Sequence, residues 1–350
     1  MHITKGECLA RYNCLAANVS WFTFFCGDLL YNGWVQVHAS SPIEWIRFVS
    51  MKLPDLFIRG RERLLDSLSG VHPSLVLNRE PAQARGAPPS DLAARLNDVL
   101  RSLKAKAMDA SGARIDYAAL RRSTAYADYH ERYLSQLSTF NPQSLPNLNE
   151  RRAFWINVYN ALVIDAVIAF DVRASVTEGL LGTLPFFRRA AYKVGGNRVS
   201  LDDIEHGILR GNRGHPLLPG RHFSSSDPRL LWVLPLDPRI HFALNCGARS
   251  CPPIRSYDPH NLDAQLDLAA RSFVNSTVEI RHGEVRLSQL FRWYRADFGE
   301  REGVSKLLDD YLDDDRRRAL REQNGSSLRW RYTPYDWGLN ALRAASPQFS

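Results

Sequence analysis

Cysteine is scarce in this sequence, and its spacing fits neither a disulfide framework nor a zinc site. The 350 residues include five cysteines, which are Cys8, Cys14, Cys26, Cys246 and Cys251. So sparse and odd a number does not build a disulfide framework, and a reducing compartment is the default for such a chain. No pair forms a C-x-x-C motif and no cluster of His and Cys has zinc-finger spacing, so we predict no metal site. These absences favour a cytoplasmic protein.

Motifs for cofactor and nucleotide binding are also missing. The sequence contains no glycine-rich phosphate loop, no G-x-S-x-G nucleophile elbow and no internal repeat. We therefore predict no bound cofactor, and we leave an unknown small molecule or peptide as the expected partner.

Lysine is rare although the chain is basic. Only 6 of the 45 basic residues are lysines, and the formal net charge is +8. The 39 arginines are spread along the chain and interrupted by acids, whereas a nucleic-acid surface would gather them on one face or one helix. We expect a dispersed arginine surface and no nucleic-acid partner.

Long uninterrupted apolar runs are absent near the N-terminus. Residues 15–37 are rich in apolar and aromatic side chains, but polar residues and glycines such as Asn18, Asp28 and Asn32 interrupt them. A membrane-spanning helix needs roughly 20 nearly uninterrupted apolar residues, so we predict no stable span. Lys5 and Arg11 precede this stretch as in a signal peptide, and secretion or N-terminal targeting is not excluded.

Composition divides the chain into three parts. We expect residues 1–50 to be a poorly structured or apolar extension, and residues 51–90 to be a basic segment followed by a Pro-rich linker. Residues 91–345 then read as a single α+β domain. Helices are predicted over 90–112, 124–138 and 261–275, and hairpins over 191–199 and 278–287. We expect the helices to pack on a mostly antiparallel sheet.

One predicted helix, over residues 150–170, is apolar on nearly all sides and must be buried at the centre of the domain. Asn157 and Asn160 lie three residues apart on one face of it. A buried amide without partners costs roughly 1–3 kcal/mol, so both need hydrogen bonds. They either tie neighbouring loop backbone to the helix or serve a catalytic site.

A second polar group follows the first hairpin. Ser200 and Asp203 fit a capping box that opens a helix. On that helix His206 stands beside acidic residues and Arg210, which indicates a solvated or ion-paired histidine.

Residues 237–253 carry the most reactive side chains. The alternation of Ile240, Phe242 and Leu244 predicts a strand with His241 and Asn245 on its other face. A tight loop then follows, with a thiol at each end, Cys246 and Cys251. Three interpretations of these thiols remain open. In the first, one thiol is a nucleophile and His241 is its base. In the second, the two thiols form a reversible disulfide, and in the third both are small buried apolar groups.

Four segments together resemble the domain of unknown function 547 family. They are AFWINVYNALV, SLDDIEHGILR, HFALNCGARSCPP and LFRWYRADFG, within roughly residues 114–300, with a weaker similarity in YDWGLN at 335–340. The resemblance implies a cytosolic-type domain with no assigned reaction. Its motif positions are Trp155, Asn157, Tyr159, Asn160, Glu205, His206, Arg210, His241, Asn245, Cys246, Ser250, Cys251 and Pro252.

A central helix followed by a histidine-bearing strand is similar, by analogy, to the architecture of papain- and transglutaminase-like enzymes. In those enzymes the nucleophilic cysteine begins the central helix, and this helix has none. We therefore expect a thiol-dependent site for acyl transfer or hydrolysis, with His241 and Cys246 or Cys251 as catalytic candidates. Supporting positions are Asn157, Asn160, Asn245, Glu205, His206 and Arg210. The alternative is a non-catalytic binding module or a thiol-redox-regulated one.

Overall fold

The structure is a computed structural model that describes residues 42–78, 91–178, 182–281, 283–323 and 329–342. The chain divides into two compact units, residues 1–52 and 53–350. Most of the extension predicted over residues 1–50 lies outside the described residues, as do Cys8, Cys14 and Cys26. Helix α2 (Pro42–Leu68) begins before the expected boundary at residue 51.

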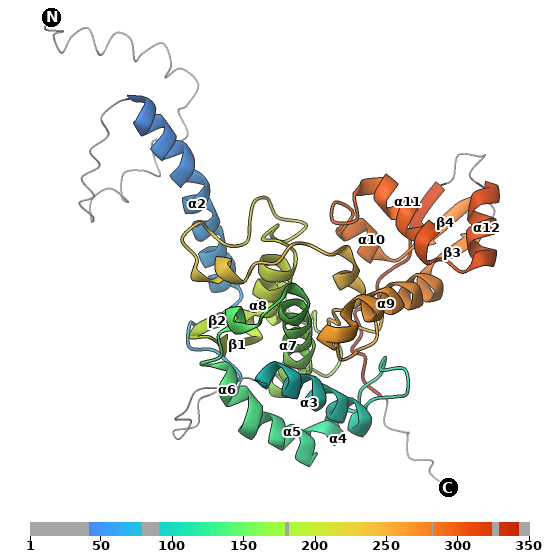
Figure 1. Ribbon diagram of the computed structural model, residues 1–350, viewed down its shortest axis with the longest axis horizontal. Coiled ribbons are helices and arrows are strands. Elements are labelled where there is room, and N and C mark those ends of the chain that lie inside the picture. The colour runs from blue at the N-terminus through green and yellow to red at the C-terminus, as the bar shows by residue number, and fades with distance from the viewer. Residues whose placement is uncertain (1–41, 79–90, 179–181, 282, 324–328, 343–350) are drawn as a thin grey trace, which may run out of the picture. The chain divides into compact units, whose positions relative to one another are not determined.

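Helix α7 (Leu148–Ala169) lies at the centre of the second unit, as predicted (Figure 1). The side chain of Asn147 caps it by accepting the N–H of Glu150 at 2.9 Å. Seventeen of its residues are buried, which matches a helix that packs on all sides. It is also the one described helix long and apolar enough to cross a membrane, and 94% of its apolar window is buried inside the protein.

The helices before α7 cover one side of it. Helix α3 (Leu92–Ala107) lies within the helix predicted over 90–112 and buries one apolar face, made of Leu92, Leu96, Val99, Leu100 and Leu103. After α4 (Tyr117–Arg121), the helix predicted over 124–138 forms three consecutive pieces. These are α5 (Thr124–Asp128), a π-helical turn η1 (Tyr129–Leu134) and α6 (Ser135–Leu137).

Asp165 is a fully buried carboxylate on α7 that the sequence analysis missed. It accepts the hydroxyl of Tyr126 at 2.5 Å and that of Tyr192 at 3.0 Å, and it bonds to Nε2 of His130 at 2.7 Å. These bonds join α5, η1 and strand β1 to the central helix. Because a buried charge needs such partners, the network identifies a structural role for Asp165.

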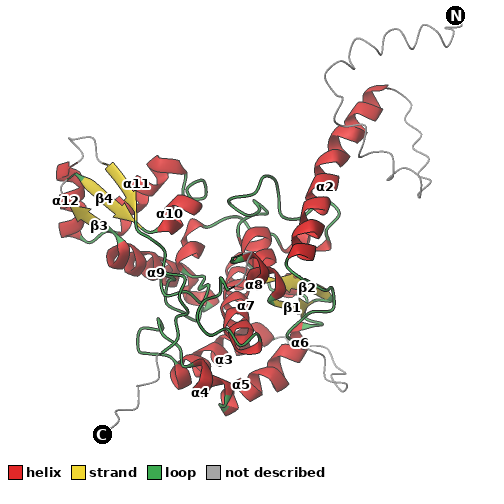
Figure 2. Ribbon diagram, turned by 180° about the vertical axis from the view of Figure 1, so that it is seen from behind, coloured by secondary structure: helices red, strands yellow, loops and turns green. Residues whose placement is uncertain are grey.

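The strands form two small sheets in place of the single sheet predicted (Figure 2). β1 (Ala191–Val194) and β2 (Asn197–Ser200) pair antiparallel around the predicted Gly195-Gly196 turn. β3 (Glu279–Arg281) and β4 (Glu284–Leu287) form the second predicted hairpin, and β5 (Arg329–Tyr332) joins β4 in parallel. The α+β class is confirmed, but the helices do not pack on one broad sheet.

A second apolar cluster accompanies the three-stranded sheet. It involves α9 (Leu262–Thr277), α10 (Gln289–Trp293), α11 (Glu300–Tyr311) and α12 (Asp314–Gln323), which group with β3 and β4 (Figure 1). The helix predicted over 261–275 is confirmed, and Ser288 caps α10, since its Oγ accepts the N–H of Leu290 at 3.3 Å. This cluster and the one around α7 meet at residues 240–244.

The strand predicted at residues 240–244 is wrong. The segment is a 3₁₀-helix, η5 (Pro238–Phe242), in which the side chain of Asp237 accepts the N–H of Arg239 at 3.0 Å. Proline fixes its own φ near the helical value and has no N–H to lose in a first turn, so Asp-Pro opens a helical turn. Three other described 3₁₀-helices begin with an Asx-Pro pair, namely η2 (Pro142–Ser144), η4 (Pro228–Trp232) and η6 (Pro259–Asn261).

Helix α8 (Leu184–Arg189) contacts the part of α2 that belongs to the second unit. The guanidinium of Arg188 pairs with Glu62 at 2.7 Å and with Asp66 at 2.8 Å. Further on, Asn78 donates to the carbonyls of Leu134 and Lys193 at 3.0 and 2.9 Å. The start of the predicted linker therefore packs against the fold, while residues 79–90 lie outside the described residues.

Asn157 and Asn160 hold loop backbone to α7 by two and three hydrogen bonds, respectively, the third bond of Asn160 being to the carbonyl of Arg255 at 3.5 Å. Asn157 donates to the carbonyl of Tyr257 at 2.8 Å and accepts its N–H at 2.9 Å. Asn160 donates to the carbonyl of Ala243 at 3.1 Å and accepts the N–H of Asn245 at 3.0 Å. Both amides thus hydrogen-bond to loop backbone, which is the first of the two roles considered for them. These bonds fix the segment from 243 to 257.

We expect Asn160→Ala to lower the free energy of unfolding by about 2–3 kcal/mol, because it leaves a buried N–H and a buried carbonyl without partners. Urea denaturation measures this loss. Asn197→Ala is the control, because its side chain bonds only to the carbonyl of Gly195 in a turn, and it should cost less than about 1 kcal/mol. Equal effects of the two substitutions would contradict the assigned role.

Candidate functional site

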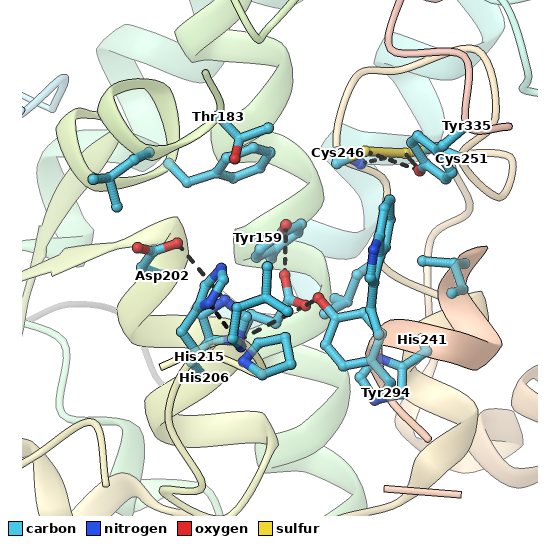
Figure 3. A pocket seen from close by; sticks show the side chains of 18 of the residues that line it. Tyr159, Thr183, Asp202, His206, His215, His241, Cys246, Cys251, Tyr294 and Tyr335 are labelled. Atoms are coloured by element: carbon cyan, nitrogen blue, oxygen red, sulfur yellow. Dashed lines mark hydrogen bonds and ion pairs between the residues drawn. A yellow bond between two sulfur atoms is a disulfide. The ribbon is translucent and has the colours of Figure 1, made fainter. Parts of the chain in front are cut away.

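A cavity of about 400 Å³ lies where the two apolar clusters meet. Its lining is mostly apolar and aromatic, with contributions from α7, α8, α10, the residues at 200–218 and the loop after η5. Figure 3 shows Cys246, Cys251 and Tyr335 on one side, and Asp202, His206 and His215 on the opposite side, with Tyr159 between them. Its size and its few convergent polar groups are typical of small-molecule sites.

A disulfide joins Cys246 to Cys251 in the wall of this cavity. Both sulfurs lie within hydrogen-bonding distance of the Tyr335 hydroxyl, at 3.3 and 3.1 Å. Sγ of Cys251 also accepts the N–H of Cys246 at 3.0 Å. Both cysteines are half-buried, so a small molecule in the cavity can reach the bridge.

The loop between the two cysteines is held independently of the bridge. Asn245 donates to the carbonyl of Pro252 at 2.6 Å and accepts the N–H of Gly247 at 2.8 Å. Backbone bonds at 2.8–2.9 Å tie Arg249 and Gly247 to residues 338 and 340. Gly247 has φ +84°, which favours glycine.

The opposite wall belongs to a π-helix, η3 (Asp203–Leu209). The predicted capping box is confirmed at its start, since Asp203 accepts the N–H of Ser200 at 2.8 Å and Ser200 Oγ accepts the N–H of Asp203 at 3.1 Å. Single π-helical turns occur frequently at functional sites.

Glu205 on η3 is held by two phenols. Its Oε2 accepts the hydroxyl of Tyr159 at 2.9 Å, and its Oε1 accepts the hydroxyl of Tyr294 at 2.5 Å. Its side chain is 12% exposed. Burial and the nearby Glu205 charge raise the pKa of both tyrosines well above their ordinary value, so both remain protonated donors.

His206 is buried, which corrects the prediction of a solvated side chain. Its Nδ1 lies 3.1 Å from a guanidinium nitrogen of Arg210. Because a guanidinium only donates, Nδ1 must accept, and the ring proton is on Nε2. Burial, with the charges of His215 and Arg210, lowers the pKa of His206 well below its ordinary value, so the ring is neutral at pH 7.

Nε2 of His206 lies 3.9 Å from the carboxyl of Asp202. Burial raises the pKa of Asp202 to about 7, against the opposing charges of Arg188 and His222. Burial also lowers the pKa of His215 to about 4. The rings of His206 and His215 meet edge to face, with their centroids 4.9 Å apart.

His241 makes its hydrogen bond to Asp297 and not to sulfur. Its Nε2 lies 2.9 Å from Asp297 Oδ2, and its ring stacks on Tyr294 with a centroid distance of 3.8 Å. Arg210 donates to both oxygens of Asp297, at 2.5 and 3.1 Å. Burial would raise the pKa of Asp297, but bonds from His241 and Arg210 hold it far below its usual range. Burial lowers the pKa of His241 despite that bond.

The predicted site residues therefore separate into two groups. The cavity brings together Glu205, His206, His241, Cys246 and Cys251. Asn157, Asn160 and Asn245 bond to backbone behind it, and Arg210 holds Asp297.

Several residues that complete the cavity were missed by the sequence analysis. Asp202, His215, Tyr294 and Tyr335 line it, and Asp297 supports it from behind through His241. Asp202 and His215 lie close in sequence to His206, so their nearness to that histidine could have indicated them. The other three lie more than forty residues from 237–253, so only the fold shows the contact.

Residues 142–274 match a family model described as "Protein of unknown function, DUF547". This match agrees with the resemblance that the sequence motifs indicate. Comparison with curated proteins found no match, and neither did comparison with solved structures. The DUF547 segment supplies η3, His241 and the disulfide, whereas Tyr294, Asp297 and Tyr335 lie beyond residue 274. The expected match over residues 114–300 was broader than the one found.

No cluster of His, Cys, Asp and Glu with the arrangement of a metal site occurs within the described ranges. The carboxylates in and behind the cavity wall each have two hydrogen-bonding partners. Glu205 is bonded to two phenols, and Asp297 is bonded to His241 and Arg210. Such an arrangement can bind a polar group and exchange a proton with it through Asp202 or His206.

We expect Asp202→Asn to change how stability depends on pH. From pH about 4 to about 7 the unfolded chain has lost this proton while the folded protein keeps it, so Asp202 destabilises the wild type increasingly as pH rises. Over this pH range the free energy of unfolding of the variant should rise relative to that of the wild type by up to about 4 kcal/mol. Urea denaturation at several pH values measures the difference.

The His206 contribution runs the other way, since a lowered histidine pKa costs stability as pH falls, but it is present in both proteins and cancels in the difference. Asp315→Asn, at a side chain that is 94% exposed, is the control and should leave the profile unchanged. Parallel profiles for Asp202→Asn and the wild type would show that Asp202 has an ordinary pKa.

Proposed function

We propose that the cavity is a small-molecule binding site whose ligand affinity is regulated by the redox state of Cys246 and Cys251. The observation that carries the proposal is that the disulfide is part of the cavity wall, opposite the polar residues of η3. A ligand that fills the cavity must therefore contact the bridge or the residues around it.

The regulatory step is thiol–disulfide exchange. A dithiol reductant transfers two electrons and two protons to the bridge, the S–S bond breaks, and two thiols form while the reductant becomes its own disulfide. Two unbonded sulfurs need more room than a bonded pair, so they displace the hydroxyl of Tyr335 that contacts both. Tyr335 packs on Trp293 and Trp337, with centroids 5.0 and 4.6 Å away, and all three line the cavity.

The change stays local because the loop has other supports. The bonds of Asn245 and the backbone bonds to residues 338 and 340 involve neither sulfur. Reduction therefore reshapes one wall of the cavity without releasing the loop from the fold.

We expect the dissociation constant of indole, a neutral aromatic probe, to change at least about threefold when the wild-type protein is reduced with dithiothreitol. A double variant, Cys246→Ser with Cys251→Ser, should bind indole equally with and without reductant, because the remaining cysteines lie outside this loop. Ligand-observed NMR measures both constants, and peptide mass mapping verifies the 246–251 crosslink. Leu244→Trp, which fills the cavity, should abolish binding in both states. An unchanged wild-type constant would contradict redox regulation.

The second candidate is thiol-dependent acyl transfer or hydrolysis in the reduced protein. The observation that favours it is that His241 and both cysteines line one cavity. It is also the form in which the analogy with papain- and transglutaminase-like enzymes would apply. It requires His241 to leave its bond with Asp297 and to reach a sulfur.

Alkylation of the reduced protein separates the two candidates. Because His241 is bonded to Asp297, we expect His241→Ala to change the iodoacetamide rates of Cys246 and Cys251 by less than about twofold. A tenfold slower rate in the variant, or a wild-type thiol pKa near neutrality, would establish the thiol nucleophile instead.

A further inference from the structure

The charge of the cavity limits the kind of molecule that it can hold, and this inference rests on the cavity being a ligand site. Among the residues that the structure describes, the lining includes two carboxyl groups, Asp202 and Glu205, and no Lys or Arg. The nearest guanidiniums are already paired. Arg210 is bonded to both oxygens of Asp297, and Arg188 pairs with Glu62, Asp66 and Asp202.

Glu205 has no Lys or Arg at salt-bridge distance among the described residues, and the Arg210 charge acts on it only from beyond that distance. Its two hydrogen-bond donors are phenols, which are neutral. The closest ring nitrogen, Nδ1 of His206 at 4.0 Å, accepts an N–H from Arg210 and so carries no proton for Glu205. Each carboxylate oxygen has a second lone pair to offer. A half-desolvated carboxylate in this state favours a cation in the cavity beside it.

The histidines of the cavity do not supply that cation. Burial lowers the pKa of His206, His215 and His241 below their ordinary value. All three are neutral at pH 7, so they do not offset the charge of Glu205.

Aromatic rings supply the rest of the environment. Tyr159, Phe187, Trp293, Tyr335 and Trp337 line the cavity, whereas the Tyr294 ring is stacked on His241 and lies under the Arg210 guanidinium. The face of an aromatic ring attracts an ammonium group, by about 0.5–1 kcal/mol when exposed and more when desolvated. The same faces and the two carboxyl groups repel an anion.

We propose that the cavity binds an organic amine, a primary or quaternary ammonium group on an apolar or aromatic body, with its charged nitrogen beside Glu205. The ammonium replaces the missing counter-ion of the carboxylate. The body of the ligand packs against the tryptophans and Tyr335 next to the disulfide. A cavity of about 400 Å³ accommodates a molecule of this kind.

Three probes of similar size and different charge test the proposal on the full chain. They are 2-phenylethylamine, 2-phenylethanol and 3-phenylpropanoate, each titrated by calorimetry or ligand-observed NMR at pH 7. We expect the amine to bind at least tenfold more tightly than the alcohol, and the carboxylate to bind most weakly. This ranking is obtained with the wild-type protein, so it does not depend on the folding of any variant.

Glu205→Gln identifies the group responsible. It should weaken amine binding at least tenfold and leave alcohol binding within twofold of the wild type. Glu302→Gln removes the same charge from an exposed position on α11 and is the matched control, with no expected change. Equal binding of amine and alcohol by the wild type, tighter binding of the carboxylate, or no binding of any probe overturns the proposal.

Repeating the titrations with oxidised and with reduced protein tests amine binding and redox regulation separately. An amine preference with equal constants in both states supports the ligand class and contradicts regulation by the cysteines. Constants that change on reduction without any amine preference support regulation and contradict the ligand class.

Discussion

The rest of the structure depends on how the buried helix α7 satisfies its polar side chains. Asn157 and Asn160 are at most 1% exposed, and each bonds to both carbonyl and N–H groups of the 243–257 segment. A carboxamide offers a donor and an acceptor side by side, as a neighbouring strand would, so it can hold irregular backbone in a fixed register. The loop with the two cysteines is therefore positioned by the core of the protein, and the cavity wall inherits the rigidity of the helix.

Local signals were sufficient for part of the fold. The capping box at Ser200 and Asp203, the Gly195-Gly196 hairpin and the all-round burial of α7 each depend on residues within one element, and each was predicted correctly. The strand at 240–244 failed because alternation was weighed without the preceding Asp237-Pro238 pair. All five residues there are buried because two clusters meet at them, so alternation carried no information about which face was exposed.

The candidate site was less predictable, because it is assembled from distant parts of the chain. The π-helix η3 and the cysteine loop could be found as motifs, but what surrounds them could not. Asp297 determines where His241 points, Tyr294 determines how Glu205 is bonded, and Tyr335 contacts both sulfurs. His241 was expected beside a thiol because the two are close in sequence, and in the structure its ring bonds to Asp297, 56 positions away.

Burial explains why this basic protein contains an acidic cavity. The net charge of +8 belongs to the whole chain, and its arginines stay ionised because guanidinium groups do not lose their protons. Imidazoles do, so the same desolvation that leaves Arg210 charged and paired makes His206, His215 and His241 neutral. Glu205 accepts two phenol hydrogen bonds, and within the described part of the chain no Lys or Arg forms a salt bridge with it. The charge that a ligand meets is therefore set by which groups are desolvated and paired at the cavity, and it can be opposite in sign to the charge of the protein.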